Sequence, residues 1–321
     1  MKSPLRLLAL VLTLSLAGTL NGCSPSIDQL FQQGNAALSA GNYTQAELIW
    51  RRVIQLNPKS AYAYFGLGNA LSNQGKLEDA SAAYRQGIQL DPKNADAYIA
   101  LGNTVYNQGK LEEAIAAYRQ AIQLNSKSAV AYYGLGVALG KQKKLEEAIA
   151  AYRQAIQLDP KFALTYYGLG VALGKQGKLE AAIAAYRQAI QLDPKNADAY
   201  IALGNAVYNQ GKLEEAIAAF RQGIQLDPKS ARAYNNLGFV LTKQGKLEKA
   251  IASFRKAIEL EPKFTPAYSN LGSVLIDRGK LEEAIAAYRQ ALSLPDDKSG
   301  TSLQQQDDLE AAIEEYKNRS K

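Results

Sequence analysis

A period of 34 residues dominates the sequence after residue 26 and constrains the fold more than any other feature. The segment LEEAIAAYRQAIQL occurs unchanged at 111–124 and 145–158, and close variants follow at 179–192 and 213–226. Eight units of this length fit end to end and cover 272 of the 321 residues, with bounds at 27–60, 61–94, 95–128, 129–162, 163–196, 197–230, 231–264 and 265–298. Because a unit this short cannot bury its apolar face alone, such units must stack on one another to form a core.

Each unit is predicted to form two helices. In the third unit, Tyr98, Leu101 and Val105 recur at helical spacing and form the apolar stripe of a first helix. Gly109 ends that helix in the manner of a left-handed cap, and a second apolar stripe starts at Leu111. Five units carry a polar residue that is placed to cap the first helix: Ser60, Asn94, Ser128, Asn196 and Ser230.

Proline follows the second helix in several units, where it cannot continue the helix, as at Pro92, Pro160, Pro194, Pro228 and Pro262. Departures from the repeat are local, and one of them is Pro295, which comes one residue early in the last unit. Ser126 stands where the third unit lacks its proline, and Lys143 takes the place of the turn glycine in the fourth unit.

This pattern resembles the tetratricopeptide repeat (TPR). The sixth unit shows it well, with Tyr200 and Leu203-Gly204 in its first helix, Phe220 in its second and Pro228 after it. The glycine is expected because the two helices approach closely at that point. The resemblance implies an all-α fold, an α-solenoid of eight helix-turn-helix units that form a right-handed superhelix.

Residues 299–321 are predicted to form a loop and a capping helix. Leu309, Ala312, Ile313 and Tyr316 repeat the stripe of a second helix, and the open end of a solenoid needs a cover with a polar outer face. A partner-binding tail is the alternative.

Residues 1–22 match a secretory signal peptide. Lys2 and Arg6 precede an apolar run over 7–20, which is too short to span a bilayer. We therefore expect the mature chain to begin at residue 23.

The signal ends Leu-Asn-Gly-Cys23, which resembles the lipobox of bacterial lipoproteins. The resemblance implies that Cys23 carries diacylglycerol and fatty-acyl chains of the palmitate type, with 23–26 as a lipidated linker. The protein would then be exported and anchored to a bacterial membrane, facing the periplasm or the cell exterior. Asn21 departs from the usual pattern. An ordinary cleaved signal, and a soluble secreted or periplasmic product, is therefore the alternative.

Composition excludes several kinds of active site. The chain has no histidine and a single cysteine, so it has no imidazole base, no histidine metal ligand and no intramolecular disulfide. The formal charge of +7 falls to +5 without residues 1–22, and it is dispersed over a solvated surface rather than gathered into a nucleic-acid-binding stripe. We predict no enzyme activity, no cofactor, no metal and no nucleic-acid partner.

A second set of side chains falls on the first helices, beside the core stripe. In TPR proteins this face lines the concave groove, so the resemblance implies a partner-binding surface made of Asn35, Asn69, Asn103, Asn205, Tyr62, Phe65, Ile99, Tyr106, Tyr133, Tyr167, Ile201 and Tyr208. Asparagine offers a donor and an acceptor to the main chain of a peptide, and aromatic rings add contact area at low entropic cost.

One site known from the family is absent. TPR domains that grip a terminal carboxylate use lysine and arginine at set groove positions, but Phe65 and Ile201 stand at two of those positions here. Arg232 and Lys243 are isolated cations. The sequence therefore predicts a membrane-tethered, non-catalytic scaffold that binds peptide or helix segments of partner proteins, for assembly of envelope complexes. A glycan-binding module, or an enzyme that uses the aromatic groove, is the alternative.

Overall fold

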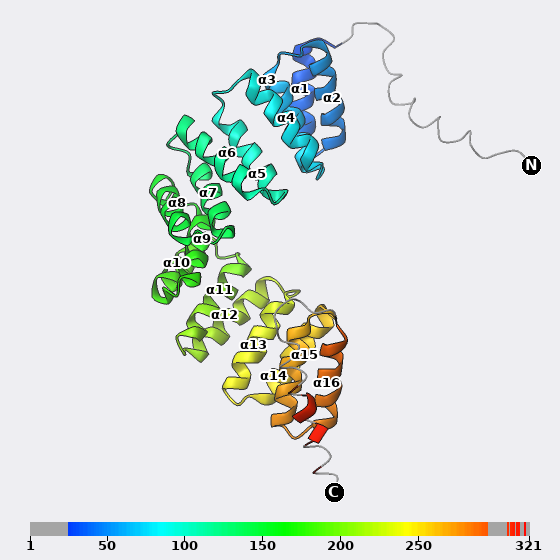
Figure 1. Cartoon of the computed structure of the whole chain (residues 1–321), viewed down its shortest axis with the longest axis vertical. Coiled ribbons are helices and arrows are strands. Elements are labelled where there is room, and N and C mark those ends of the chain that lie inside the picture. The colour runs from blue at the N-terminus through cyan, green and yellow to red at the C-terminus, as the bar shows by residue number, and fades with distance from the viewer. Residues whose placement is uncertain (1–24, 295–306, 308, 312, 315–317, 319–321) are drawn as a thin grey trace, which may run out of the picture. The chain divides into compact units, whose positions relative to one another are not determined.

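The computed structural model describes residues 25–294, together with 307, 309–311, 313, 314 and 318. Residues 25–294 contain sixteen helices and no strand, so the predicted all-α class is confirmed (Figure 1). The chain divides into two compact units, Met1–Ser126 and Lys127–Lys321, called here the N-terminal and C-terminal units.

The N-terminal unit contains α1 (Ile27–Ser39), α2 (Tyr43–Leu56), α3 (Ala61–Asn73), α4 (Leu77–Leu90), α5 (Ala95–Asn107) and α6 (Leu111–Leu124). The C-terminal unit contains α7 (Ala129–Lys141), α8 (Leu145–Leu158), α9 (Ala163–Lys175), α10 (Leu179–Leu192), α11 (Ala197–Asn209), α12 (Leu213–Leu226), α13 (Ala231–Lys243), α14 (Leu247–Leu260), α15 (Thr265–Asp277) and α16 (Leu281–Ser293).

Within each unit, every helix packs on the helix before it and the helix after it. Odd-numbered helices also contact the next odd-numbered helix, as in α1 with α3 and α11 with α13. These odd-numbered helices are called the inner helices. Each unit is thus a stack of antiparallel helix pairs, as expected for TPR units.

The predicted helix boundaries follow from local chemistry. The five predicted caps are confirmed, since the side chain of each accepts a hydrogen bond from the backbone amide three residues on. The predicted left-handed turn at Gly109 is also confirmed, with φ of 79°. Lys143 adopts the same conformation with φ of 64°, which costs a residue with a Cβ about 1–2 kcal/mol.

The core of each pair is an aromatic ring laid over a glycine. Tyr84 on α4 lies against Gly68 on α3, where a Cβ would come within 2.6 Å of the ring. Phe220 on α12 lies in the same way against Gly204 on α11, with a corresponding distance of 2.7 Å. Both rings are buried. The predicted need for a small residue at this position is therefore explained by direct contact with the ring.

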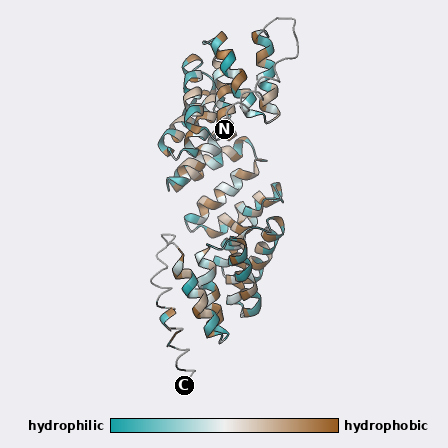
Figure 2. Ribbon diagram, turned by 90° about the vertical axis from the view of Figure 1, so that its right-hand side faces the viewer, coloured by the Kyte–Doolittle hydropathy of each residue, from teal (hydrophilic) through white to brown (hydrophobic). Residues whose placement is uncertain are grey.

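Polar contacts join successive pairs on the outer side. Arg255 on α14 forms an ion pair with Glu283 on α16 at 2.6 Å, and Arg187 pairs in the same way with Glu215. Apolar and polar stretches alternate along the helices, as expected for amphipathic helices (Figure 2). Exposed pairs of this kind contribute about 0–1 kcal/mol each, so burial of the apolar faces holds the stack together.

Several predictions fall on residues that the structure does not describe. The signal peptide and Cys23 lie outside the described residues, as do most of 299–321. The described part of the last segment is helical, and Leu309 and Ile313 are half-exposed there. None of the described helices combines the length and apolar character that crossing a membrane requires.

A candidate partner-binding surface on the inner helices

All twelve residues predicted for the groove lie on inner helices. Those of the N-terminal unit are Asn35 on α1, Tyr62, Phe65 and Asn69 on α3, and Ile99, Asn103 and Tyr106 on α5. Those of the C-terminal unit are Tyr133 on α7, Tyr167 on α9, and Ile201, Asn205 and Tyr208 on α11. Because inner helices contact one another within a unit, each unit brings its own members of the set onto neighbouring helices.

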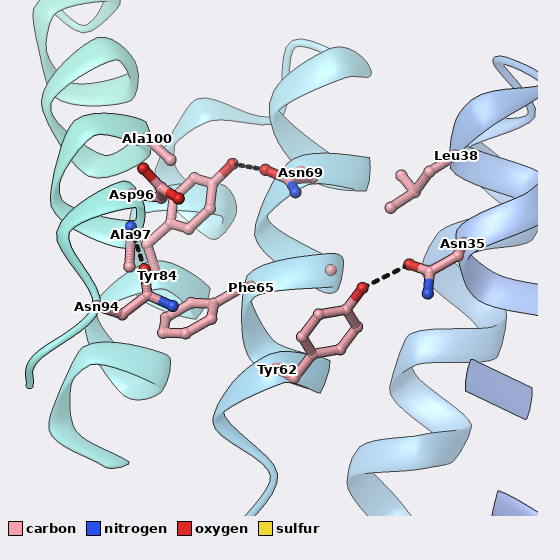
Figure 3. A pocket seen from close by; sticks show the side chains of 11 residues that line it. Asn35, Leu38, Tyr62, Phe65, Asn69, Tyr84, Asn94, Asp96, Ala97 and Ala100 are labelled. Carbon is pink, nitrogen blue, oxygen red and sulfur yellow. Dashed lines mark hydrogen bonds between the residues drawn. The ribbon is translucent and has the colours of Figure 1, made fainter. Parts of the chain in front are cut away.

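The N-terminal unit has a pocket of about 240 Å³ between α1, α3 and α5, called the α1–α5 pocket. Asn35, Tyr62, Phe65 and Asn69 line it together with Asp96. Figure 3 shows these side chains around one space, with Asp96 contributed by α5 and Asn35 by the opposite wall. The pocket therefore combines asparagine amides and one carboxylate with three aromatic rings, since Tyr84 also lines it.

Two asparagines of this unit are bound internally through their carbonyl oxygens. The Tyr84 hydroxyl donates to Asn69 Oδ1 at 2.6 Å, and the Tyr118 hydroxyl donates to Asn103 Oδ1 at the same distance. Burial raises the pKa of Tyr84 well above its usual range, so the hydroxyl keeps its proton for this bond. The exposed Asn69 side chain consequently offers its amide protons, and its carbonyl is already engaged.

Tyr62 is the most exposed aromatic residue of the set, at 52%. Its hydroxyl donates to Asn35 Oδ1 at 3.0 Å, which links α3 to α1 (Figure 3). The ring lies 5.5 Å from Phe31 and 5.7 Å from Trp50, measured between centroids. It is thus held in place by contacts on one side and presents its other side to solvent.

Tyr133 and Tyr167 are half-buried on α7 and α9. Each contacts the core tyrosine of its own pair, with centroids 6.1 Å apart for Tyr133–Tyr152 and 6.0 Å apart for Tyr167–Tyr186. The pKa of Tyr167 is raised, first by burial and then by the nearby carboxylate of Asp198. Only part of each ring is therefore accessible to a partner.

Ile99 and Ile201 contribute packing rather than contact surface. They are only 9% and 7% exposed. Ile201 packs over Gly223 of α12, where a Cβ would come within 2.9 Å of Ile201 Cγ1. The small residue opposite lets the isoleucine turn into the core, so the place of these two residues on the predicted face does not make them accessible.

The C-terminal unit has a pocket of about 250 Å³ between α11, α12 and α13, called the α11–α13 pocket. It is lined by Asn205, Tyr208, Asn209, Phe220, Asn236, Phe239 and Val240. Tyr208 and Phe239 meet edge to face with centroids 5.5 Å apart. Lys243 Nζ lies 5.5 Å from the centroid of the Phe239 ring, which holds the ammonium group beside this aromatic wall.

The sequence analysis missed two residues of this surface. Asp96 lines the α1–α5 pocket from the register position that Tyr62 occupies one repeat earlier. Asn235 is 8% exposed at the position where Phe65, Ile99 and Tyr133 stand in other repeats. Asn235 could have been identified from the sequence, because it places an amide at a register that is aromatic or aliphatic in those repeats.

The chemistry available on these faces is that of amides, hydroxyls and aromatic rings. Within the described residues, no group of three or more histidine, cysteine, aspartate or glutamate side chains is placed to hold a metal ion. What the pockets offer is hydrogen bonding to a polar chain and contact for apolar side chains.

Comparison with known proteins identifies the family. The model of the cilia and flagella-associated protein 70 C-terminal domain, a TPR domain, matches residues 92–312, and the TPR-repeat model matches 34–75 and 68–109. The first match spans more than half of the chain. The chain therefore belongs to this family of TPR domains.

Solved structures agree with the fold. The Cut9 and Hcn1 hetero-tetramer of the APC/C is 20% identical with a TM-score of 0.64, and the match covers 78% of this chain and 49% of that one. This likeness shows the fold alone.

Two shorter matches have lower TM-scores. YrrB, described as a TPR protein with an unusual peptide-binding site, is 28% identical with a TM-score of 0.49, over 58% of this chain and 96% of its own. MamA is 31% identical with a TM-score of 0.48, over 52% of this chain and 97% of its own. No curated protein sequence matches the chain.

Proposed function

We propose that the chain is a membrane-tethered, non-catalytic TPR scaffold whose inner helices bind segments of partner proteins. The observation that carries the proposal is the pair of pockets on inner helices, one in each unit, both walled by amides and aromatic rings. A TPR core requires the rings that cover the glycines, but it does not require exposed amides beside exposed rings.

The exposed groups suit a polypeptide better than a compact small molecule. Asn69 on α3 and Asn103 on α5 repeat at one register position, with a carbonyl bound internally and amide protons left to donate. Donors spaced along successive helices match the carbonyls of an extended or helical segment, and Tyr62 adds apolar area nearby. Each pocket alone is small, so affinity would come from several contacts along one segment.

The tether rests on the sequence around Cys23. We propose that the protein is exported, cut before Cys23 and acylated there, and that it assembles complexes of the bacterial envelope. Two or more acyl chains would anchor it stably, since each buried CH₂ contributes about 0.8 kcal/mol.

Crosslinking in cells tests the scaffold function. A full chain with a photo-crosslinking residue on α3 or α11 should capture specific proteins, and Tyr62→Ala and Tyr208→Ala should each reduce capture at least several-fold. Leu48→Ala is the matched control, because Leu48 is 66% exposed on the outer helix α2. Capture that is equally reduced by the control, or glycan capture without any protein, would contradict the proposal.

Intact-mass measurement of the membrane fraction tests the tether. The mature chain should begin at Cys23 and carry the mass of its acyl chains, and Cys23→Ser should release it from the membrane. A soluble product with another first residue, unchanged by Cys23→Ser, would refute acylation and leave the scaffold function standing.

A further inference from the structure

Four asparagines on three successive inner helices of the C-terminal unit lie in one chain of amide contacts. Asn270 Nδ2 on α15 donates to Asn235 Oδ1 on α13 at 2.9 Å, and Asn236 Nδ2 on α13 donates to Asn205 Oδ1 on α11 at 2.9 Å. Asn235 and Asn236 are joined by a weak contact of 3.5 Å from Nδ2 to Oδ1. Every contact runs in the same direction, with the amide nitrogen donating toward α11.

This direction decides what the α11–α13 pocket presents. The carbonyl of Asn205 is engaged by Asn236, while Asn205 Nδ2 donates to no acceptor among the described residues. An amide nitrogen carries two protons, so Asn205 brings two unused donors to the pocket and Asn236 brings one. Phe220 forms the floor without a hydroxyl, and it cannot bind Asn205 as Tyr84 binds Asn69.

Lys243 brings a positive charge to Phe239, which belongs to the aromatic wall of this pocket. Lys243 ends α13. Its register holds Lys141 on α7 and Lys175 on α9, whereas it holds Asn209 on α11 and Asp277 on α15. The acids of the inner helices in this unit are Asp198, in the first turn of α11 and hence at the opposite end of that helix from Asn209, and Asp277 on α15. In the N-terminal unit the register of Lys243 holds neutral residues: Ser39, Asn73 and Asn107.

We infer that the α11–α13 pocket binds the side-chain carboxylate of an aspartate or glutamate within a partner segment. The carboxylate accepts hydrogen bonds from Asn205 Nδ2 and an ionic contact from Lys243, and charge-assisted bonds of this kind are the strong ones. The neighbouring residues of the segment lie against Tyr208 and Phe239. This inference rests on the proposed function and names the chemistry of its partner.

An internal side chain fits better than a chain end. Inner helices of the same unit continue on both sides of the pocket, with α9 before α11 and α15 after α13. A segment whose carboxylate sits in the pocket can therefore follow the inner helices in either direction.

Selection from a displayed library of random peptides with blocked termini tests the inference. Peptides selected on the full chain should be enriched in aspartate or glutamate flanked by apolar residues. A selected peptide, labelled for fluorescence anisotropy, should bind at least tenfold more weakly when its acid is replaced by the amide. Lys243→Gln should cause a similar loss, because a carboxylate–ammonium contact is removed in both cases.

A double-mutant cycle separates recognition from a general effect on structure. On the Lys243→Gln chain, replacing the acid of the peptide should cost almost nothing further. Lys249→Gln is the matched control, because it removes the same charge from the outer helix α14 of the same repeat. Asn205→Val, the residue found at this register in Val137 and Val171, should weaken the acidic peptide without lowering thermal stability much.

The outcomes distinguish the two proposals. If no peptide of any kind is enriched, the proposed function is refuted. If peptides are enriched without acids, the inference is wrong and the scaffold function stands. Equal losses for Lys243→Gln and Lys249→Gln would also overturn it.

Discussion

Asn69 in the N-terminal unit and Asn205 in the C-terminal unit occupy the same register of an inner helix, yet they bind differently. Asn69 accepts from the hydroxyl of Tyr84 within its own repeat. Asn205 lies over Phe220, which has no hydroxyl, and accepts instead from Asn236 of the next repeat. Two differences therefore separate the sites: the hydroxyl of the core ring, and the side chain at the register of Asn236, which is Ala100 in the repeat after Asn69.

The comparison shows how a repeat array diversifies its surface. The ring that covers the glycine is required by packing in both places, so the core tolerates tyrosine or phenylalanine there. The hydroxyl is free to vary, and its presence adds a hydrogen-bond partner within the repeat for an exposed side chain. Differences in binding chemistry can thus arise from substitutions in the core that keep the fold.

Removal of either ring should have the largest effect and should not distinguish the two sites. Tyr84→Ala and Phe220→Ala should each lower the free energy of unfolding by about 4 kcal/mol, because both rings are buried against a glycine. Urea unfolding of the full chain measures both. A gap of more than about 2 kcal/mol between the two variants would show that the sites differ in packing.

Removal of the hydroxyl alone should affect the N-terminal unit. Tyr84→Phe should lower the free energy of unfolding by about 1 kcal/mol, since it deletes one hydrogen bond and leaves Asn69 in contact with water. Tyr118→Phe repeats the test on Asn103. The hydroxyl of Tyr64 has no hydrogen-bond partner within the described residues, so Tyr64→Phe should not change the stability. A similar loss of stability in Tyr64→Phe would show that the losses in Tyr84→Phe and Tyr118→Phe do not come from the bonds to asparagine.

The reverse change should add a bond within the repeat to the C-terminal site. Phe220→Tyr places a hydroxyl beside Asn205 Oδ1, whose second lone pair is available, and should stabilise the chain by about 0.5 kcal/mol. Thermal unfolding beside wild type measures the gain. Destabilisation would mean that the pocket floor has no room for the oxygen and that phenylalanine is required there.

The smallest expected effect is a loss of stability at alkaline pH, caused by the buried Tyr84. Burial raises the pKa of Tyr84, so above about pH 10 the unfolded chain loses a proton that the folded chain keeps, and stability falls as the pH rises. At pH 10 the contribution of Tyr84 should fall by about 0.4 kcal/mol. The difference in free energy of unfolding between wild type and Tyr84→Phe should be smaller at pH 10 than at pH 7 by this amount. A larger difference at pH 10 would show that the pKa of Tyr84 is not raised by folding.

The fold was accessible from the sequence because its determinants are local and repeated. Serine and asparagine before the first helices, and glycine after them, cap and terminate as their chemistry predicts. Lys143 is the exception, because it forms the same left-handed turn without glycine. The repeat pattern indicates this position, since the other units have glycine there. The division at Ser126 was not predicted, although the missing proline at that position was noticed.

The candidate surface was only partly accessible. Register placed all twelve side chains on inner helices, but register does not report how far a side chain turns into the core. Ile99 and Ile201 are buried, Ile201 over Gly223, and the partners of Asn69 and Asn205 depend on side chains of other helices. The direction of the amide chain needed coordinates, since it follows from which nitrogen faces which oxygen.

The sequence of α6 is identical to that of α8. The surface of α6 therefore cannot by itself make α5 pair with α6 rather than with α8. The short loop between α5 and α6 favours the correct pairing because it keeps α6 at a high local concentration. Because the two helices are identical, the fold can tolerate recombination that adds or removes whole repeats. A deletion or duplication of 34 residues between the two copies joins surfaces that already match, whereas any other length breaks the register of every helix that follows. The gene for such a chain can lengthen or shorten its product in steps of one repeat without inventing a new interface.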